Sequence, residues 1–280
     1  MNNREKRVEI FLDTEKIMKE KKILTTAIIN SINQTKVYVS LEEGRTDVKE
    51  TACVVVVSKD RSFAAAEKYN KRHPDDKIAV LNFASATNPG GGVKTGSSAQ
   101  EEALCRCSTL YPVLTTKMVY ESFYKYHRTG KNVLYSDMCI YTPEIIVFKT
   151  DTNEPVLKTE ENWLKVDIIT CAAPNLRPIP YNKMNPGSGA AAKITQKELL
   201  VLLKKRTEQI LNVAARNHID ALILGAFGCG AFCNPPEVVA RAFKESLEKY
   251  KYCFKYVEFA VYCKDTETAN YDVFNRNFRR

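Results

Sequence analysis

The sequence predicts an α/β fold with a largely parallel central sheet, because apolar strand-like runs alternate with helical segments along the chain. The apolar runs are short and end in glycine, proline or polar residues, as KIAVLNFA does at 77–84. The helical segments repeat apolar residues at the spacing of one helix face. No internal repeat or convincing linker divides the 280 residues, so we expect one domain with an added N-terminal helical segment.

The first half of the chain contains three predicted helices and three predicted strands. In chain order these are a helix at 3–31, strands at 36–41 and 52–58, a helix at 62–72, a strand at 77–84 and a helix at 99–111. The runs at 52–58 and 77–84 are almost entirely apolar, which is typical of strands buried on both faces.

The second half continues the alternation, with less regular segments at its start. We expect a helix at 117–127, a strand at 138–149 interrupted by Pro143, a polar loop or hairpin at 150–162, a strand at 163–175, a Pro/Gly-rich loop at 176–190, a helix at 194–218, a strand running into glycines at 220–234, a helix at 235–250 and a strand at 256–263. The helix at 194–218 has one apolar face, and Lys204, Lys205 and Arg206 are predicted to be solvated on the other. The helix at 235–250 begins with proline, which its first turn tolerates.

Charge and cysteine content indicate the kind of partner, the absence of a metal site and the cellular compartment. The formal net charge is +9, from 42 Lys+Arg against 33 Asp+Glu, which favours a polyanionic partner or serves solubility alone. The nine cysteines form no paired CxxC framework, and the chain has only three histidines, so we expect no metal site. We therefore expect reduced thiols and an intracellular, cytoplasmic protein. We find no signal peptide and no membrane segment.

Two glycine-rich loops follow apolar strands and precede helices, which is where open α/β sheets bind ligands. They lie at residues 88–96 and 225–232. Glycine permits positive φ and a close approach of backbone N–H groups to an anion. The first loop matches neither nucleotide fingerprint, because Ser97 replaces the P-loop lysine and Thr95 replaces the last dinucleotide glycine. Two such loops suit a diphosphate between them; the alternative is a pair of tight turns.

A pair of glutamates opens the helix after the first loop. Ser98 and Glu101 fit a capping box, in which Glu101 would reach back to the Ser98 amide. Adjacent helical residues point about 100° apart, so we expect Glu101 and Glu102 to serve different tasks. A carboxylate beside a diphosphate loop indicates acid–base chemistry on an attached sugar. Burial and a nearby anion would raise its pKa, whereas the helix N-terminus would lower it.

The motifs resemble those of microbial-type poly(ADP-ribose) glycohydrolases. The sequence GGG at Gly90–Gly92 is followed after seven residues by QEE at Gln100–Glu102, within VLNFASATNPGGG. The stretches TCAAPN and GAFGCGAFCNPP follow in the same order, and the resemblance covers most of the chain. It implies a macrodomain-like, three-layer α/β/α fold with a mixed, largely parallel central sheet. It also implies one domain over 1–280, with an N-terminal helical extension at 1–34 and the core at 35–280.

The resemblance also implies a reaction and a set of site residues. The reaction is hydrolysis of the ribose–ribose O-glycosidic bonds of poly(ADP-ribose), with Glu102 as general acid and then base and Glu101 holding the neighbouring ribose. Gln100 would set the turn, and the backbone amides of Gly91, Gly92 and Val93 would face the distal ribose and diphosphate. Phe227 would pack against the sugar. The remaining substrate-binding residues implied are Asn88 and Gly90, and the diphosphate loop made of Gly225, Ala226, Phe227, Gly228, Cys229, Gly230, Ala231 and Phe232.

Several alternatives remain open at this stage. The same cleft could remove mono-ADP-ribose from a protein or a nucleic acid, or could bind ADP-ribose without catalysis. Nucleic acid is a further partner that the charge allows but no motif indicates. We expect no cofactor, poly(ADP-ribose) or ADP-ribosylated protein as partner, ADP-ribose as product, and a monomer. Trp163 is expected in the core, His127 at the surface or in a loop, and Cys229 as a small residue and not a nucleophile.

Overall fold

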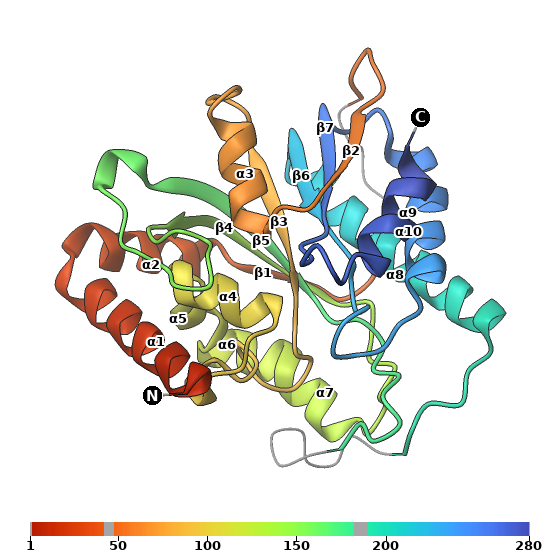
Figure 1. The fold of residues 1–280 in the computed structure, drawn as a ribbon, viewed down its shortest axis with the longest axis horizontal. Coiled ribbons are helices and arrows are strands. Elements are labelled where there is room, and N and C mark those ends of the chain that lie inside the picture. Colours follow the sequence, from red (N-terminus) through yellow and green to blue (C-terminus); the bar gives the residue numbers. More distant parts are fainter. Residues whose placement is uncertain (1, 42–47, 182–189, 280) are drawn as a thin grey trace.

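The computed structural model describes residues 2–41, 48–181 and 190–279, and these contain a seven-stranded sheet of order β1-β4-β5-β3-β6-β7-β2 (Figure 1). The strands from β5 to β2 in this order run parallel, whereas β4 is antiparallel to both β5 and β1. The predicted mixed, largely parallel sheet is therefore confirmed. The strands are β1 (Lys36–Tyr38), β2 (Val54–Ser58), β3 (Ile78–Phe83), β4 (Cys139–Val147), β5 (Leu164–Cys171), β6 (Ala221–Leu224) and β7 (Tyr256–Ala260).

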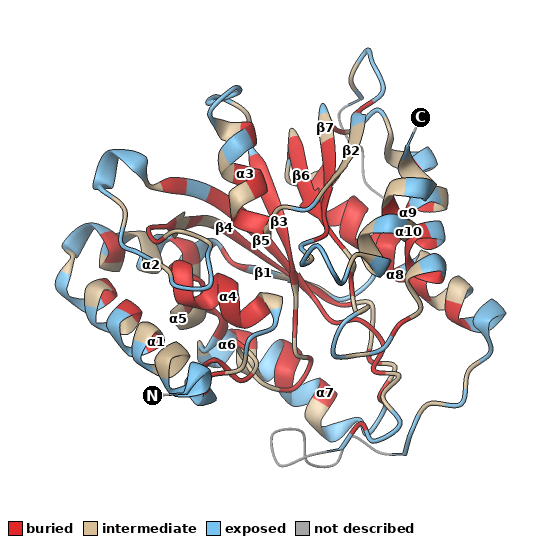
Figure 2. Ribbon diagram, viewed as in Figure 1, coloured by how far each residue is buried: buried red, intermediate tan, exposed pale blue. Residues whose placement is uncertain are grey.

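Helices cover both faces of the sheet and complete three layers. Helices α1 to α6 pack on one face, and α8, α9 and α10 pack on the other (Figures 1 and 2). The helices are α1 (Asn3–Glu20), α2 (Lys22–Gln34), α3 (Ser62–Asn70), α4 (Gln100–Cys107), α5 (Leu110–Leu114), α6 (Lys117–Val119), α7 (Lys125–Thr129), α8 (Gln196–Arg216), α9 (Pro236–Tyr250) and α10 (Ala269–Phe278), with short 3₁₀ or π turns η1 (Val93–Thr95), η2 (Tyr120–Tyr124) and η3 (Glu160–Asn162).

The central strand β3 contributes side chains to both halves of the core. Ile78 and Val80 face the α1–α6 layer, whereas Ala79 and Leu81 face the α8–α10 layer. This alternation follows from the two-residue period of a strand. Each of the larger side chains contributes about 1.5–3 kcal/mol through burial. The prediction that this strand is buried on both faces is confirmed.

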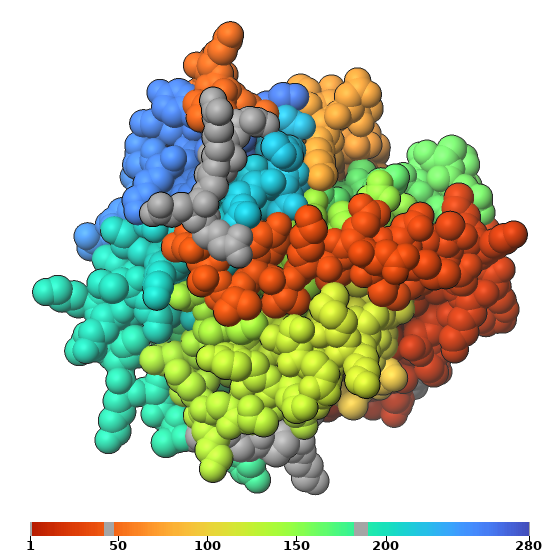
Figure 3. Space-filling view, turned by 180° about the vertical axis from the view of Figure 1, so that it is seen from behind, coloured from red at the N-terminus to blue at the C-terminus, as the bar shows by residue number. Residues whose placement is uncertain are grey.

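The same prediction is wrong for β2. This strand lies at the edge of the sheet, where β7 is the neighbour it pairs with, and Val54 is exposed. An apolar run reports β-propensity but not the number of neighbouring strands. From behind, the red-orange segment that contains β1, the opposite edge strand, crosses the middle of the molecule above the yellow-green segment (Figure 3).

The N-terminal helical segment is two helices fixed to the core, not one. Lys21 has extended backbone angles and separates α1 from α2. Thr14 Oγ1 donates a hydrogen bond of 2.7 Å to the carbonyl of Arg106 in α4. The buried Lys149, just after β4, bonds to Asp13 Oδ2 at 2.7 Å and to Thr14 Oγ1 at 2.8 Å. These contacts fix the position of α1 beside the loop that carries the glycine run.

The prediction that Arg206 is solvated is wrong. Its side chain is buried, and its Nε donates to Asp137 Oδ1 at 2.7 Å. The guanidinium also donates to the carbonyls of Ala172 and Leu134, so the buried charge is neutralised and its donors are used. Lys205 is exposed as expected, and Lys204 is partly exposed. Arg206 thus fixes the segment before β4 to the end of β5.

The prediction that His127 lies at the surface or in a loop is also wrong. It is buried in α7, where Nδ1 contacts the Phe123 carbonyl and Nε2 contacts Ser136 Oγ, each at 2.8 Å. Burial lowers the pKa of His127 to about 4, so the ring is neutral at neutral pH. Trp163 is partly buried against Phe148, and its indole donates to the Lys158 carbonyl at 3.1 Å.

Most other predicted elements are confirmed with shorter bounds. The interruption at Pro143 is a register shift in β4 between Thr142 and Ile145. Helix α10 was not predicted; its Phe274 packs against Phe259 of β7. Of the loop predicted at 176–190, residues 182–189 lie outside the described part. In the described ranges, no helix has the length and apolar character to span a membrane.

Candidate active site

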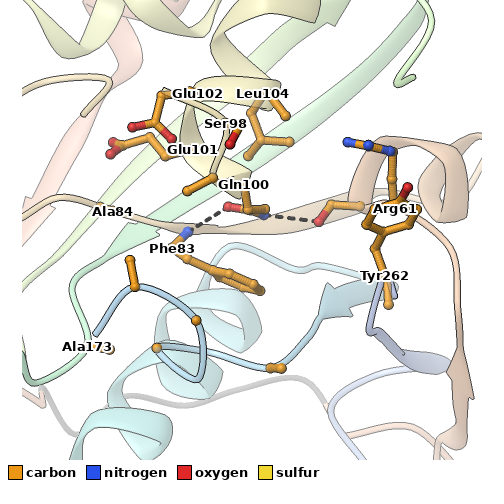
Figure 4. Close-up of a pocket in the computed structure, with 18 of the residues that line it drawn as sticks. Arg61, Phe83, Ala84, Ser98, Gln100, Glu101, Glu102, Leu104, Ala173 and Tyr262 are labelled. Carbon is orange, nitrogen blue, oxygen red and sulfur yellow. Dashed lines mark hydrogen bonds between the residues drawn. The ribbon is translucent and has the colours of Figure 1, made fainter. Parts of the chain in front are cut away.

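The two glycine-rich loops meet at one edge of the sheet because they follow neighbouring parallel strands. β3 and β6 pair in parallel, so their carboxyl ends lie side by side. A cavity of about 380 Å³ opens there between α4 and the loop after β6 (Figure 4). We call it the first cavity. The predicted site residues that line it are Gln100, Glu101, Glu102, Ala226, Gly228, Gly230, Ala231 and Phe232.

A second cavity, of about 430 Å³, adjoins the first at Glu102, Ala231 and Phe232, which line both. It extends toward α1 and the loop after β5. Three arginines line it, Arg4, Arg7 and Arg177, and sequence reasoning assigned none of them to a site. The predicted residues found only in the second cavity are Asn88, Gly91 and Gly92.

Close contacts of the loop with the segment that follows require glycine in the run at 90–92. Gly90 and Gly91 have φ of +67° and +57°, which favours residues without a Cβ. A Cβ at Gly91 would lie 2.4 Å from Glu102 Oε1, and one at Gly90 would lie 2.6 Å from the Tyr111 ring. Gly90 and Gly91 therefore let the loop pass close to helix α4, with Gly91 directly against the carboxylate of Glu102.

Glu102 is held through one carboxylate oxygen, and its other oxygen has no hydrogen-bond partner in the described residues. Its Oε1 accepts a hydrogen bond of 2.8 Å from the N–H of Gly92. Its Oε2 is buried and has no hydrogen-bond partner among the described residues. A buried polar atom without a partner costs free energy and in a native protein calls for an explanation. Glu102 is the residue of the glutamate pair that borders both cavities, and its Oε2 is the carboxylate oxygen that the described protein leaves without a partner.

Glu101, in contrast, has protein partners for both oxygens. Oε2 accepts from the Ser85 N–H at 2.7 Å, and Oε1 accepts from Asn82 Nδ2 at 3.3 Å. Burial first, and the charge of Glu102 second, raise the pKa of Glu101 well above its ordinary value, while its hydrogen-bond donors act in the opposite direction. The carboxyl groups of Glu101 and Glu102 lie side by side, although the helix sets these neighbours about 100° apart (Figure 4).

The capping box predicted for Ser98 and Glu101 is wrong. The N-cap of α4 is Ala99, and no side chain caps this end. Glu101 turns instead to the Ser85 amide in the loop after β3. The capping-box motif considers only partners that are near in sequence. In the fold, the Ser85 N–H lies close to Glu101 and donates to its carboxylate instead.

Gln100 joins α4 to the end of β3. Its Oε1 accepts from the Phe83 N–H at 2.9 Å, and its Nε2 donates to Ser62 Oγ at 3.0 Å (Figure 4). The same Nε2 also donates to the Leu81 carbonyl at 2.8 Å. β6 pairs with β3 only as far as Val80. The Gln100 amide therefore satisfies the strand groups that β6 leaves unpaired, and it sets where α4 begins. This supports the expected role of Gln100 in the geometry of the turn.

The backbone amides of Gly91, Gly92 and Val93 donate to acceptors of the protein itself, and their contact with the distal ribose and diphosphate stays a prediction. Gly91 donates to the Asn88 carbonyl at 2.9 Å, and Val93 donates to the Gly90 carbonyl at 3.2 Å. The Gly92 amide holds Glu102. The loop after β6 differs: within the described part of the chain, the amides of Gly228, Gly230, Ala231 and Phe232 donate to no acceptor.

The Phe227 ring, which we expected to pack against the sugar, lines neither cavity. The ring is fully buried, 5.9 Å from the Phe83 ring and 6.5 Å from the Phe243 ring, measured between centroids. The aromatic residues that line the first cavity include Phe83 and Phe232. Gly90, Val93, Gly225 and Cys229 also line neither cavity. Burial raises the pKa of Cys229 to about 12, so its thiol stays protonated and is a poor nucleophile.

The far end of the first cavity contains residues that sequence reasoning missed. Arg61 follows β2 and Tyr262 follows β7, so the rule that ligands bind at the carboxyl ends of strands could have found both. The guanidinium of Arg61 lies 4.1 Å from the centroid of the Tyr262 ring. Asp151 accepts from the Phe63 N–H at 3.0 Å, and burial raises its pKa. In the ranges described, no group of His, Cys, Asp or Glu is arranged to hold a metal ion.

A model of the microbial-type PARG catalytic domain family matches residues 6–150. The match covers more than half of the chain and includes both the glycine run and the glutamate pair. The chain belongs to this family. PARG is poly(ADP-ribose) glycohydrolase, so the predicted family and enzyme class are confirmed. A comparison with curated proteins gave no match.

Solved PARG structures resemble the chain beyond the residues that the family model matches. PARG from Thermomonospora curvata is 27% identical with a TM-score of 0.81, and the alignment covers 98% of this chain and 100% of that one. The same enzyme bound to the inhibitor ADP-HPD gives 27% and 0.79 with the same coverage. PARG from Deinococcus radiodurans in complex with ADP-ribose is 33% identical with a TM-score of 0.72, covering 89% of this chain and 96% of that one. The macrodomain-like fold is thereby confirmed.

Proposed function

We propose that this PARG family member hydrolyses the ribose–ribose O-glycosidic bonds of poly(ADP-ribose), with Glu102 as general acid and then general base. The observation that carries the assignment of Glu102 is its Oε2 atom, which is buried without a partner in the described residues, at the place where the two cavities meet. Glu101 is engaged by Ser85 and Asn82 and has no comparable free atom.

One ADP-ribose unit would occupy the first cavity. The complex of the D. radiodurans enzyme with ADP-ribose supports this ligand class. The pyrophosphate would lie against the loop after β6, since the amides of Gly228, Gly230, Ala231 and Phe232 are not used within the described protein. The adenosine would extend toward Phe83, Arg61 and Tyr262, and the distal ribose would reach Glu102.

The reaction then proceeds in two steps at the anomeric carbon of the distal ribose. As the C1″–O2′ bond breaks, the Glu102 carboxyl transfers its proton to O2′, and the preceding unit leaves as an alcohol. Water then attacks C1″ and gives its proton to Glu102, which restores the acid. The developing positive charge of the oxocarbenium-like transition state is stabilised by the nearby pyrophosphate and carboxylates. Glu101, held by its protein donors, positions the ribose and does not transfer the proton.

We also propose that residues 1–280 act as one domain and one subunit. Arg4 and Arg7 of α1 line the second cavity, so the N-terminal helices contribute to the site and are not a separate appendage. We further propose that the protein acts as a monomer and releases ADP-ribose as its product. The nine cysteines form no paired CxxC framework, which supports an intracellular, cytoplasmic location.

The test compares wild type with Glu102→Gln on poly(ADP-ribosyl)ated protein. We expect free ADP-ribose from the wild type and a rate lower by about 10²–10⁴-fold in the variant, which is the usual contribution of a general acid–base group. Binding of ADP-ribose, measured by calorimetry, should be retained because Gln keeps the volume and the bond to Gly92. Equal turnover by the two proteins would remove Glu102 from this role. Release of the last, protein-linked ADP-ribose would extend the activity to mono-ADP-ribosylated protein.

A further inference from the structure

The second cavity places three arginines on the side of Glu102 away from the adenosine end of the first cavity. Arg4 and Arg7 come from α1, and Arg177 comes from the loop after β5. In the portion of the chain described, none of the three forms an ion pair with a carboxylate. Many other basic side chains of this protein do, including Lys6 and Lys149. The cavity therefore gathers three guanidinium groups that form no ion pair within the described residues, beside one carboxylate, that of Glu102.

Hydrogen bonds from Nε hold the three guanidinium groups in place. Arg7 Nε donates to the Gly96 carbonyl at 2.7 Å, and Arg4 Nε donates to the Thr95 carbonyl. The terminal nitrogens of both arginines have no acceptor among the described residues, so their paired N–H groups are available to a ligand. An arginine oriented in this way is suited to bidentate contact with phosphate oxygens.

Arg177 is oriented from the opposite wall of the cavity. Its Nε donates to Asn175 Oδ1 at 3.0 Å and its Nη2 to the Pro180 carbonyl at 3.2 Å. Its guanidinium lies 5.6 Å from the centroid of the Phe232 ring, a residue that lines both cavities. Arg177 thus stands at the boundary between the cavities, while Arg4 and Arg7 lie on the α1 side.

We propose that the second cavity binds the leaving unit of poly(ADP-ribose), and that Arg4, Arg7 and Arg177 bind its pyrophosphate. This inference rests on the proposed function of Glu102. In a polymer of ADP-ribose, the oxygen that leaves C1″ belongs to the adenosine ribose of the preceding unit. That adenosine carries its own pyrophosphate with two negative charges. A volume of about 430 Å³ lies within the usual range of roughly 300–1,000 Å³ for small-ligand sites.

This arrangement assigns the two cavities to the two sides of the bond that breaks. The first cavity takes the unit that is released as ADP-ribose, and the second takes the end of the polymer that remains. Binding on the leaving side favours a substrate with at least two ADP-ribose units over one with a small neutral leaving group. The enzyme would thereby distinguish polymer from other ADP-ribosyl compounds.

The test compares two substrates that share the transferred unit but differ in the leaving group. One is a two-unit fragment of poly(ADP-ribose); the other is the 4-nitrophenyl glycoside of ADP-ribose with the same anomeric configuration, whose leaving group has no phosphate. The variants are Arg7→Gln, Arg177→Gln and the double variant Arg4→Gln/Arg7→Gln. Arg241→Gln is the matched control, because Arg241 is exposed on α9 and pairs with Glu245.

We expect kcat/KM for the two-unit fragment to fall roughly tenfold in each single variant and further in the double variant, as for loss of a charge-assisted hydrogen bond. Activity on the nitrophenyl glycoside should change less than about twofold, because that substrate leaves the second cavity empty of phosphate. Equal losses on both substrates would assign the arginines to holding the loop of Thr95 and Gly96, and would overturn the proposal. Unchanged cleavage of the two-unit fragment would overturn it as well. A wild type inactive on both substrates would instead contradict the proposed function.

Discussion

At the scale of single residues, the site depends on how closely the glycine run passes over the glutamate pair. Gly92 donates to one oxygen of Glu102, and Gly91 leaves no room for a Cβ beside the same oxygen. The other oxygen is buried and has no partner among the described residues. The sequence motif indicated that glycines and glutamates act together. It did not indicate that the Gly92 amide holds the carboxylate of Glu102, so that this amide is not left for the diphosphate.

Replacing Gly91 with alanine should therefore remove most of the activity. The added Cβ would lie 2.4 Å from Glu102 Oε1 at a positive φ, so the loop or the carboxylate must move. We expect kcat to fall at least about 100-fold, the usual scale for a misplaced catalytic group, as measured by release of ADP-ribose. Gly130→Ala is the control, since Gly130 has ordinary helical angles outside both cavities. Activity of Gly91→Ala close to that of the control would contradict the packing described.

At the scale of elements, α4 is fixed to β3 by a side chain that continues the sheet. β6 ends its pairing with β3 at Val80, and the Gln100 amide serves Leu81 and Phe83 beyond that point. Helix α4 thus begins where the parallel neighbour of β3 stops. This also explains why the glutamates sit at the carboxyl edge of the sheet and not farther along the helix.

The substitution Gln100→Leu should destabilise the fold through unpaired backbone groups. It would leave the part-buried Phe83 N–H and Leu81 carbonyl without these partners, at about 1–3 kcal/mol for each group. We expect the free energy of unfolding, measured in urea, to fall by about 2–5 kcal/mol on this basis. Gln196→Leu, at an exposed position in α8, should change it by less than about 0.5 kcal/mol. A Gln100→Leu variant as stable as this control would show that the bridge contributes nothing.

Some elements of the fold could be predicted from the sequence, and others could not. Strand β3 and helix α8 were predicted because their apolar patterns are continuous and their flanks are polar. The edge position of β2 and the burial of Arg206 could not be predicted, since both depend on neighbours distant in the chain. The same reason hid the second cavity, which α1 forms with a loop after β5. Its arginines carry no motif in sequence.

At the scale of the whole molecule, the cleft lies between segments from both layers and both halves of the chain. Helix α4 and its loop supply the carboxylates, the loop after β6 supplies unused amides, and α1 closes the side beyond Glu102. The fold could be predicted because strand and helix alternate. The division of the cleft into two cavities at one carboxylate could be seen only in three dimensions.

The most direct test is a crystal structure of the Glu102→Gln variant with a two-unit fragment of poly(ADP-ribose). We expect the glycosidic oxygen within about 2.6–3.2 Å of the side chain at position 102. We also expect one pyrophosphate at the loop of residues 225–232 and the other near Arg7. A side chain at position 102 that faces bulk solvent, or a first pyrophosphate bound away from that loop, would contradict the account.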